Sequence, residues 1–244
     1  MNYLKVSKAP DLTGKDRRFY RILEIFPGAL AWGTIIALAV FSYFQPTATA
    51  IFIILFDIYW LFLVLFLGIY LVTSYRIMKR ELKVDWEKRC EELPGRTLVM
   101  PGTGKEQTLT WRDMYQLVLV PTYGESLGVI QSTFDALIAS GYPKEKMIVV
   151  LGTEVRAGEQ GREVGKQAYE LYKDKFGTVL ITAHPDDIVG ELKGKGANQA
   201  WMAAEVRKLI IDPQGIDYDR ILVSVFDADT IAHPGYFHCL TYSF

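Results

Sequence analysis

Two long apolar runs dominate the first third of the chain. They cover roughly residues 26–44 and 48–72, and little more than Gln45-Pro46-Thr47 separates them. A helix rises ~1.5 Å per residue and the hydrocarbon core of a bilayer is ~30 Å thick, so the first run is near the minimum length for a span and the second exceeds it. Proline between them suits a tight turn. The pattern predicts a transmembrane helix hairpin over residues 26–75.

Basic residues flank this predicted hairpin on both sides. Before the first span they are Lys5, Lys8, Lys15, Arg17, Arg18 and Arg21, and after the second they are Arg76, Lys79, Arg80 and Lys83. An even number of spans puts both flanks on one side of the membrane, and loops rich in lysine and arginine stay cytoplasmic. We therefore expect an integral protein of the cell membrane, with residues 1–25 and both termini in the cytoplasm.

Within the second run, Asp57 is the only charged side chain. It is interpreted either as a contact for a polar or lipid-linked substrate, or as a carboxyl group that is protonated or paired near one interface. Residues 76–115 are expected to form a juxtamembrane helix and a linker. The helix is predicted over residues 74–93, on the membrane surface or packed on the soluble domain, and residues 101–105 are predicted to form a turn.

From Gln116 onward, short apolar runs alternate with amphipathic segments. The runs cover residues 117–120, 147–151, 178–182 and 221–226 and are rich in β-branched side chains. The first amphipathic segment ends at Gly141, a typical residue just beyond a helix C-terminus. This alternation predicts an α/β domain over residues 116–244, with a mostly parallel sheet covered by helices.

Composition narrows the function classes only slightly. Half of the residues are apolar and the formal net charge is −1, so no strong overall field favours nucleic acid, and no nucleic-acid partner is expected. The two cysteines, Cys90 and Cys239, lie in no paired motif. They are interpreted as free thiols and not as nucleophiles.

The polar residues with candidate chemistry follow the predicted strands. These segments are residues 121–125 (PTYGE), 152–154 (GTE), 193–198 (KGKGAN) and 227–229 (DAD). Ligands of parallel sheets bind at the carboxyl ends of the strands. Two carboxylates at i and i+2 of an extended chain point to the same side and can hold Mg²⁺ together with substrate phosphates. Residues 193–198 are interpreted in two ways. They bind an anion, since the glycines allow close backbone approach and the helix amides and a lysine attract negative charge, or they form a solvated turn with Asn198 as a cap.

In this order and spacing, these motifs resemble family 2 glycosyltransferases of the GT-A fold, a group that includes membrane-anchored synthases. The resemblance implies that Asp227 and Asp229 bind Mg²⁺ or Mn²⁺ and that Lys195 and Asn198 lie near the diphosphate, although Lys193 could take the lysine's role. The remaining implied nucleotide-sugar-binding residues are Pro121, Thr122, Tyr123, Glu125 and Glu154. Gly124 stands where asparagine is usual, and Glu154 stands where an aspartate pair usually contacts the nucleoside.

This resemblance also implies an activity, namely transfer of a sugar from a nucleotide-diphospho-sugar to a lipid or polysaccharide acceptor. In that family the catalytic base follows the metal-binding aspartates, whereas residues 230–244 contain neither aspartate nor glutamate. We therefore expect the base beyond the chain end and the chain to hold the donor-binding half of the domain. The fourth strand should then lie near a sheet edge, with Phe226, Tyr236 and Phe237 exposed.

Two other functions remain open. Residues 183–187 (AHPDD) resemble the zinc-binding segment of deacetylases that act on N-acetyl sugars, in which His184 and Asp187 would ligate zinc and Asp186 would act as general base. Ile188 stands where that segment has glutamate. The third hypothesis is a non-catalytic, membrane-tethered nucleotide-binding module.

The membrane orientation can be tested directly. Reporter domains fused to the N-terminus and after Arg80 should both report the cytoplasmic side, because basic residues flank an even number of spans. A periplasmic or luminal signal from either fusion would contradict the predicted orientation.

Overall fold

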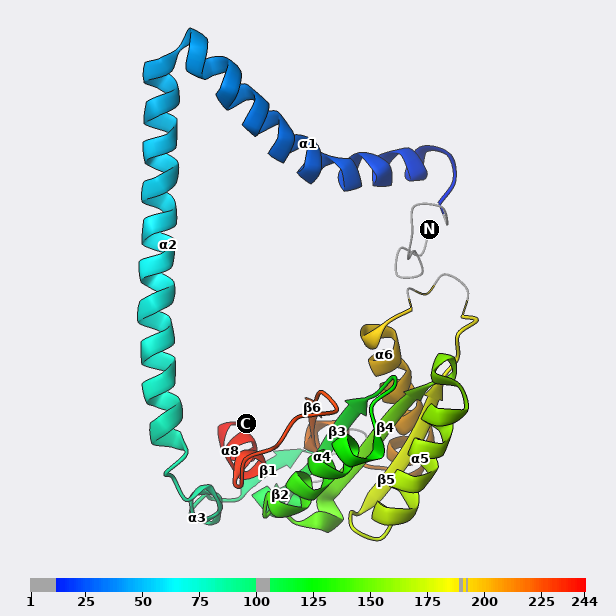
Figure 1. Ribbon diagram of the computed structural model, residues 1–244. Coiled ribbons are helices and arrows are strands. Elements are labelled where there is room, and N and C mark those ends of the chain that lie inside the picture. Colours follow the sequence, from blue (N-terminus) through cyan, green and yellow to red (C-terminus); the bar gives the residue numbers. More distant parts are fainter. Residues whose placement is uncertain (1–11, 100–105, 189–190, 192) are drawn as a thin grey trace. The chain divides into compact units, whose positions relative to one another are not determined.

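The computed structural model describes residues 12–99, 106–188, 191 and 193–244 (Figure 1). The chain divides into two compact units, with the boundary between Val84 and Asp85. The first unit holds two long helices and the second is an α/β domain.

The first unit consists of α1 (Gly14–Phe44) and α2 (Pro46–Glu81). Both helices are long and apolar enough to cross a membrane, with mean hydropathies of 1.8 and 2.7 over their most apolar windows. Their large apolar side chains are exposed, and Thr49 is the only buried residue of the two helices. Such a continuous apolar surface is typical of a segment that meets hydrocarbon or another protein.

The helix boundaries differ from the predicted spans. Helix α1 begins at Gly14 instead of Phe26, because the charged stretch that precedes the apolar run continues the same helix, with an Arg21–Glu24 ion pair at 2.6 Å. Helix α2 begins at Pro46, where the missing N–H of proline costs no hydrogen bond. The turn between the helices is therefore a single residue, Gln45.

The single helix predicted over residues 74–93 is wrong. Helix α2 ends at Glu81 and a separate α3 (Trp86–Glu91) begins after Asp85, whose side chain accepts a hydrogen bond from the Lys88 amide at 3.0 Å. An aspartate that caps a helix N-terminus favours a new helix over continuation of the old one. Trp86 lies 5.4 Å from Tyr242 between ring centroids, so α3 packs on the soluble unit.

Four parallel strands form the sheet of the second unit, in the spatial order β5-β4-β3-β6. They are β3 (Tyr115–Pro121), β4 (Met147–Glu154), β5 (Thr178–His184) and β6 (Ile221–Val225), and all four were predicted from the sequence. A separate antiparallel pair, β1 (Arg96–Val99) and β2 (Glu106–Leu109), was not predicted. The turn predicted over residues 101–105 lies outside the described residues.

Helices cover both faces of the sheet (Figure 1). On one face lie α4 (Leu127–Ala139), α5 (Gly158–Tyr172) and α8 (Tyr236–Ser243). On the other lie α6 (Lys195–Val206) and a π-helical turn (Arg207–Ile211), and the short α7 (Asp212–Gln214) continues from that turn. Alternate residues of β3 divide between the two cores, as strand geometry requires: Val118 packs with the first set and Leu117 with the second.

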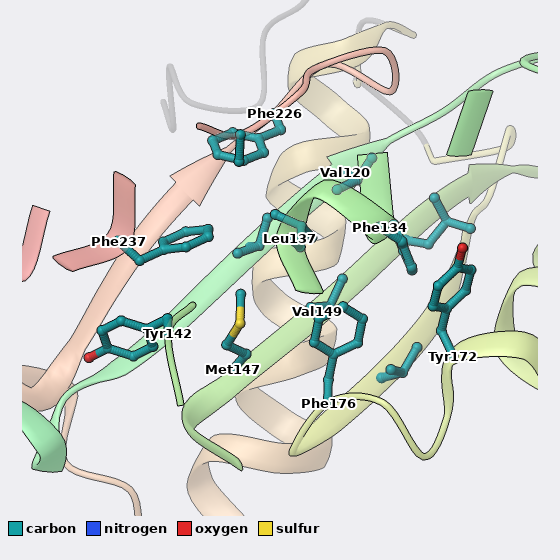
Figure 2. Packing of buried hydrophobic residues seen from close by; sticks show 14 of the residues in the cluster. Val120, Phe134, Leu137, Tyr142, Met147, Val149, Tyr172, Phe176, Phe226 and Phe237 are labelled. Carbon is teal, nitrogen blue, oxygen red and sulfur yellow. The ribbon is translucent and has the colours of Figure 1, made fainter. Parts of the chain in front are cut away.

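Aromatic side chains fill the first core (Figure 2). Phe134 of α4 contacts Tyr172 and Phe176 edge to face, with ring centroids 5.0 and 6.1 Å apart. Strand β6 lies at a sheet edge among the described strands, as expected. The predicted exposure of Phe226 and Phe237 is nevertheless wrong, because α8 folds back and stacks Phe237 on Phe226, and both are buried.

The close approach of α6 to β4 gives a stability prediction. A Cβ atom on Gly152 would lie 2.2 Å from Met202 Sδ and 2.7 Å from Asn198 Oδ1. Overpacking of this kind costs about 1–3 kcal/mol, so Gly152→Ala should lower the free energy of unfolding by that amount. Chemical denaturation followed by tryptophan fluorescence measures it.

The matched control is Gly128→Ala in α4, where a Cβ atom has no neighbour within 4 Å. Alanine in a helix is favoured over glycine by up to about 1 kcal/mol, so this variant should be as stable as the wild type or slightly more stable. Equal stabilities of the two variants would contradict the close packing at Gly152.

Candidate functional site

A cavity of ≈ 410 Å³ opens where the carboxyl ends of β3 and β4 meet the start of α6. Its lining residues are Pro121, Thr122, Tyr123, Glu125, Glu154, Arg156, Lys193, Gly194, Lys195 and Asn198. Every residue expected from the sequence to bind a nucleotide-sugar lines this cavity, apart from Asp227. Three segments that are far apart in the sequence are therefore brought to one edge of the sheet.

The carbonyl of Gly152 joins these three segments. It accepts hydrogen bonds from the Thr122 amide and from Asn198 Nδ2, both at 2.8 Å. Asn198 is 1% exposed, and its Oδ1 has no hydrogen-bond partner among the described residues. Asn198 thus ties the first turn of α6 to the end of β4, and its contact with a diphosphate stays a prediction.

Glu125 fixes the loop that follows β3. One carboxylate oxygen accepts hydrogen bonds from the Thr122 hydroxyl at 2.6 Å and from the amides of Tyr123 and Gly124 at 2.7 and 3.0 Å. Burial raises the pKa of this carboxyl group, but the hydrogen bonds outweigh burial and lower the pKa to about 2. The side chain therefore shapes the loop as a permanent anion. At Gly124 a Cβ atom would meet no neighbour within 4 Å, so glycine is not sterically required there.

Arg156 is a lining residue that the sequence analysis missed. Its Nε donates to Glu154 Oε2 at 2.8 Å, its Nη2 pairs with the same oxygen, and its guanidinium lies 5.0 Å from the centre of the Tyr123 ring. Glu154 is buried, and the arginine compensates its charge. The sequence did offer a signal for this residue, because an arginine follows two positions after a glutamate that ends a predicted strand. Tyr123 is 53% exposed and keeps ring surface for a ligand.

The two expected metal ligands lie after β6. Asp227 and Asp229 are exposed, whereas Ala228 between them is buried and its carbonyl accepts a 2.6 Å hydrogen bond from the Thr133 hydroxyl of α4. This bond holds the segment so that both carboxylates face away from the core. Asp227 is joined to the cavity by an ion pair between its Oδ1 and Lys195 Nζ.

Carboxylate pairs such as this one suit hard divalent cations. Among the described residues, no group of three or more histidine, cysteine, aspartate or glutamate side chains is arranged to hold a metal ion. A cation at Asp227 and Asp229 would therefore need further oxygen ligands from a substrate or from water, which is the arrangement that Mg²⁺ favours.

His184, the proposed zinc ligand, is engaged elsewhere. It ends β5, is 2% exposed, and its Nε2 lies 2.9 Å from Glu191 Oε2, with its ring against Trp201 of α6. Asp186 and Asp187 are exposed beyond the strand. The geometry of the described residues gives the zinc hypothesis no support.

Comparisons with known proteins do not assign the chain to a family. No family model and no curated protein matches it. Among solved structures, a mannosyltransferase from Pyrobaculum calidifontis, in complex with GDP-Man and Mn²⁺, is similar at 18% identity with a TM-score of 0.37. The similarity covers 64% of this chain and 37% of that chain, so this chain spans little more than a third of that protein. A likeness at this level assigns neither family nor function.

The hydrogen bonds to Glu125 predict a pH dependence. Its pKa falls from 4.5 to about 2 in the folded protein, so its contribution to stability is complete above about pH 4.5 and is lost as the pH falls through 2. The carboxyl carbon of Glu125, followed by NMR in specifically labelled protein, should titrate at about pH 2.

Substitution of Glu125 gives a second measurement of the same contacts. In Glu125→Gln, the amides of Tyr123 and Gly124 should exchange with solvent faster than in the wild type at pH 7, because the anionic acceptor is gone. A Glu125 titration near pH 4.5 would show that the carboxylate does not hold this loop.

Proposed function

We propose that this chain binds a nucleotide-diphospho-sugar at the carboxyl edge of its sheet and supplies the donor site of a membrane-anchored glycosyltransferase. The observation that carries the proposal is one cavity in which three cationic side chains, an exposed aromatic ring and a neighbouring carboxylate pair converge. Its volume of ≈ 410 Å³ falls within the usual range for small-molecule sites.

The cationic side chains favour a phosphate-bearing ligand. Lys193 and Lys195 stand at the start of α6, where unpaired helix amides also attract anions. In the proposed complex these two lysines orient the diphosphate. Lys195 is joined to Asp227, so the same lysine connects the phosphate end of the cavity to the carboxylate pair.

At the other end, the cavity suits a nucleoside. The exposed ring of Tyr123 offers a face for stacking, and Arg156 holds that ring from one side. Thr122 and Glu125 fix the loop that carries the ring, so the platform is formed before the ligand arrives. We assign the base and ribose to this end, with Glu154 and Arg156 as polar partners.

A divalent cation fits the remaining residues. In this proposal Asp227 and Asp229 hold Mg²⁺ or Mn²⁺, since both carboxylates are exposed and the backbone between them is fixed by Thr133. Such a cation supplies charge neutralisation at a departing diphosphate. The apolar helices α1 and α2 would hold this site at a membrane, which favours a lipid-linked or growing polysaccharide acceptor.

The direct test is metal-dependent binding of nucleoside diphosphates. UDP and GDP are titrated into the full chain in detergent, with Mn²⁺ and then with EDTA. At least one should bind more tightly with Mn²⁺, and Asp227→Ala/Asp229→Ala should weaken that binding by about tenfold or more, since hydrogen bonds and contacts to charged groups contribute about 1.5–3 kcal/mol each.

The matched control is Glu170→Ala/Asp174→Ala, which removes two exposed carboxylates near the far end of α5. This control should keep wild-type affinity. Binding that is independent of the metal, or that survives in the Asp227→Ala/Asp229→Ala protein, would overturn the proposal.

A further inference from the structure

The ion pair between Lys195 and Asp227 has a consequence for the order of binding at the site. Lys195 Nζ contacts Asp227 Oδ1, which is one of the two carboxylates assigned to the cation. An ammonium group and a divalent cation compete for the same oxygen. A cation that approaches Asp227 must therefore displace the lysine or share the oxygen with it.

We propose that Lys195 makes cation binding at Asp227 conditional on the diphosphate, by holding Asp227 until a phosphate gives the ammonium group another partner. The inference rests on the proposed binding of a divalent cation and a diphosphate at this site. It assigns Lys195 as the positioning residue that couples the two ligands.

The location of the lysine supports this exchange of partners. Lys195 is the first residue of α6 and lines the cavity, so a phosphate at the helix N-terminus lies within reach of its side chain. Its flexible stem can move the charge between the carboxylate and the phosphate without movement of the helix.

Exposure of the pair makes this exchange inexpensive. The side chains of Lys195 and Asp227 are 52% and 63% exposed, so water screens their attraction. A doubly charged cation together with a diphosphate can therefore break the pair, whereas a cation alone gains Asp227 only at the expense of the lysine. The second carboxylate, Asp229, has no ion pair in the described part of the chain.

Because the two binding events are thermodynamically linked, the coupling can be measured through the affinity for the cation or through the affinity for the diphosphate. If the diphosphate raises the affinity for the cation, the cation raises the affinity for the diphosphate by the same factor. Removal of the lysine should act with opposite signs on the two measurements: cation binding alone becomes stronger, and binding of the metal–diphosphate complex becomes weaker. If Lys195 only added positive charge to a phosphate site, its removal and the removal of Lys193 should have the same effect on both measurements.

The chain offers a matched control in Lys193. It lines the same cavity and carries the same charge, but no ion pair joins it to another described residue. Lys193→Met removes one charge from the site without releasing Asp227. Lys195→Met removes the same charge and also frees the carboxylate, so the comparison isolates the contact.

The experiment measures Mn²⁺ binding by the full chain in detergent, from the electron paramagnetic resonance signal of free Mn²⁺. Without nucleotide, Lys195→Met should bind Mn²⁺ about 1.5- to 5-fold more tightly than the wild type, the range for an exposed ion pair, whereas Lys193→Met should show a smaller change. With saturating Mn²⁺, Lys195→Met should bind UDP or GDP about tenfold more weakly, because a charge-assisted contact to phosphate is lost.

Equal Mn²⁺ affinities of wild type and Lys195→Met, no Mn²⁺ binding by either, or an equal gain in Lys193→Met would overturn the inference. Asp227→Asn/Asp229→Asn separates this outcome from failure of the proposed function. If that variant binds Mn²⁺ and diphosphate as the wild type does, the cation site itself is elsewhere. If it loses both while Lys195→Met behaves as the wild type, only the coupling role of Lys195 is wrong.

Discussion

One backbone carbonyl, that of Gly152, holds the candidate site together. It lies at the end of β4 and accepts hydrogen bonds from the Thr122 amide and from the Asn198 side chain. The first bond extends the β3–β4 pairing into the loop that carries Tyr123. The second fixes the first turn of α6, and with it the two lysines, against the same strand. A Cβ atom at this point would collide with the side chains of Met202 and Asn198, which pack directly on the strand backbone.

The electrostatics of the site follow from this convergence. Glu154 is buried and paired with Arg156, whereas Glu125 is exposed and accepts three hydrogen bonds from its own loop. These contacts fix the end of the cavity that we propose for the nucleoside. By contrast, the lysines and the two aspartates at the other end are exposed, so they can change partners when ligands arrive.

The strands and the polar residues that follow them were predictable from the sequence because both depend on local patterns. Short β-branched runs predicted all four strands of the parallel sheet, and parallel strands bring their carboxyl ends to one edge. That rule sufficed to place residues as distant as Thr122 and Lys195 around one cavity. Binding of a nucleotide-sugar by these residues stays a prediction.

Features that depend on tertiary contacts escaped the sequence analysis. The return of α8 to bury Phe237 has no local signal, because it depends on packing between distant segments. The start of α3 did have a local signal, the capping residue Asp85, which the sequence analysis missed. Arg156 was missed because its role depends on a buried partner, Glu154, and on the Tyr123 ring from the loop that follows β3. The engagement of His184 with Glu191 likewise appears only when β5 and the segment before α6 are brought together.

Hydrogen–deuterium exchange of the full chain, with and without Mn²⁺ plus UDP or GDP, tests the central claim most directly. The account predicts slower exchange in three segments, residues 121–125, 193–198 and 227–230, because all three border the proposed ligand. Exchange should be unchanged at the opposite edge of the sheet, where the amino ends of β4 and β5 lie, in residues 144–146 and 173–177. Protection confined to that opposite edge, or no protection in the three segments with either nucleotide, would contradict the account.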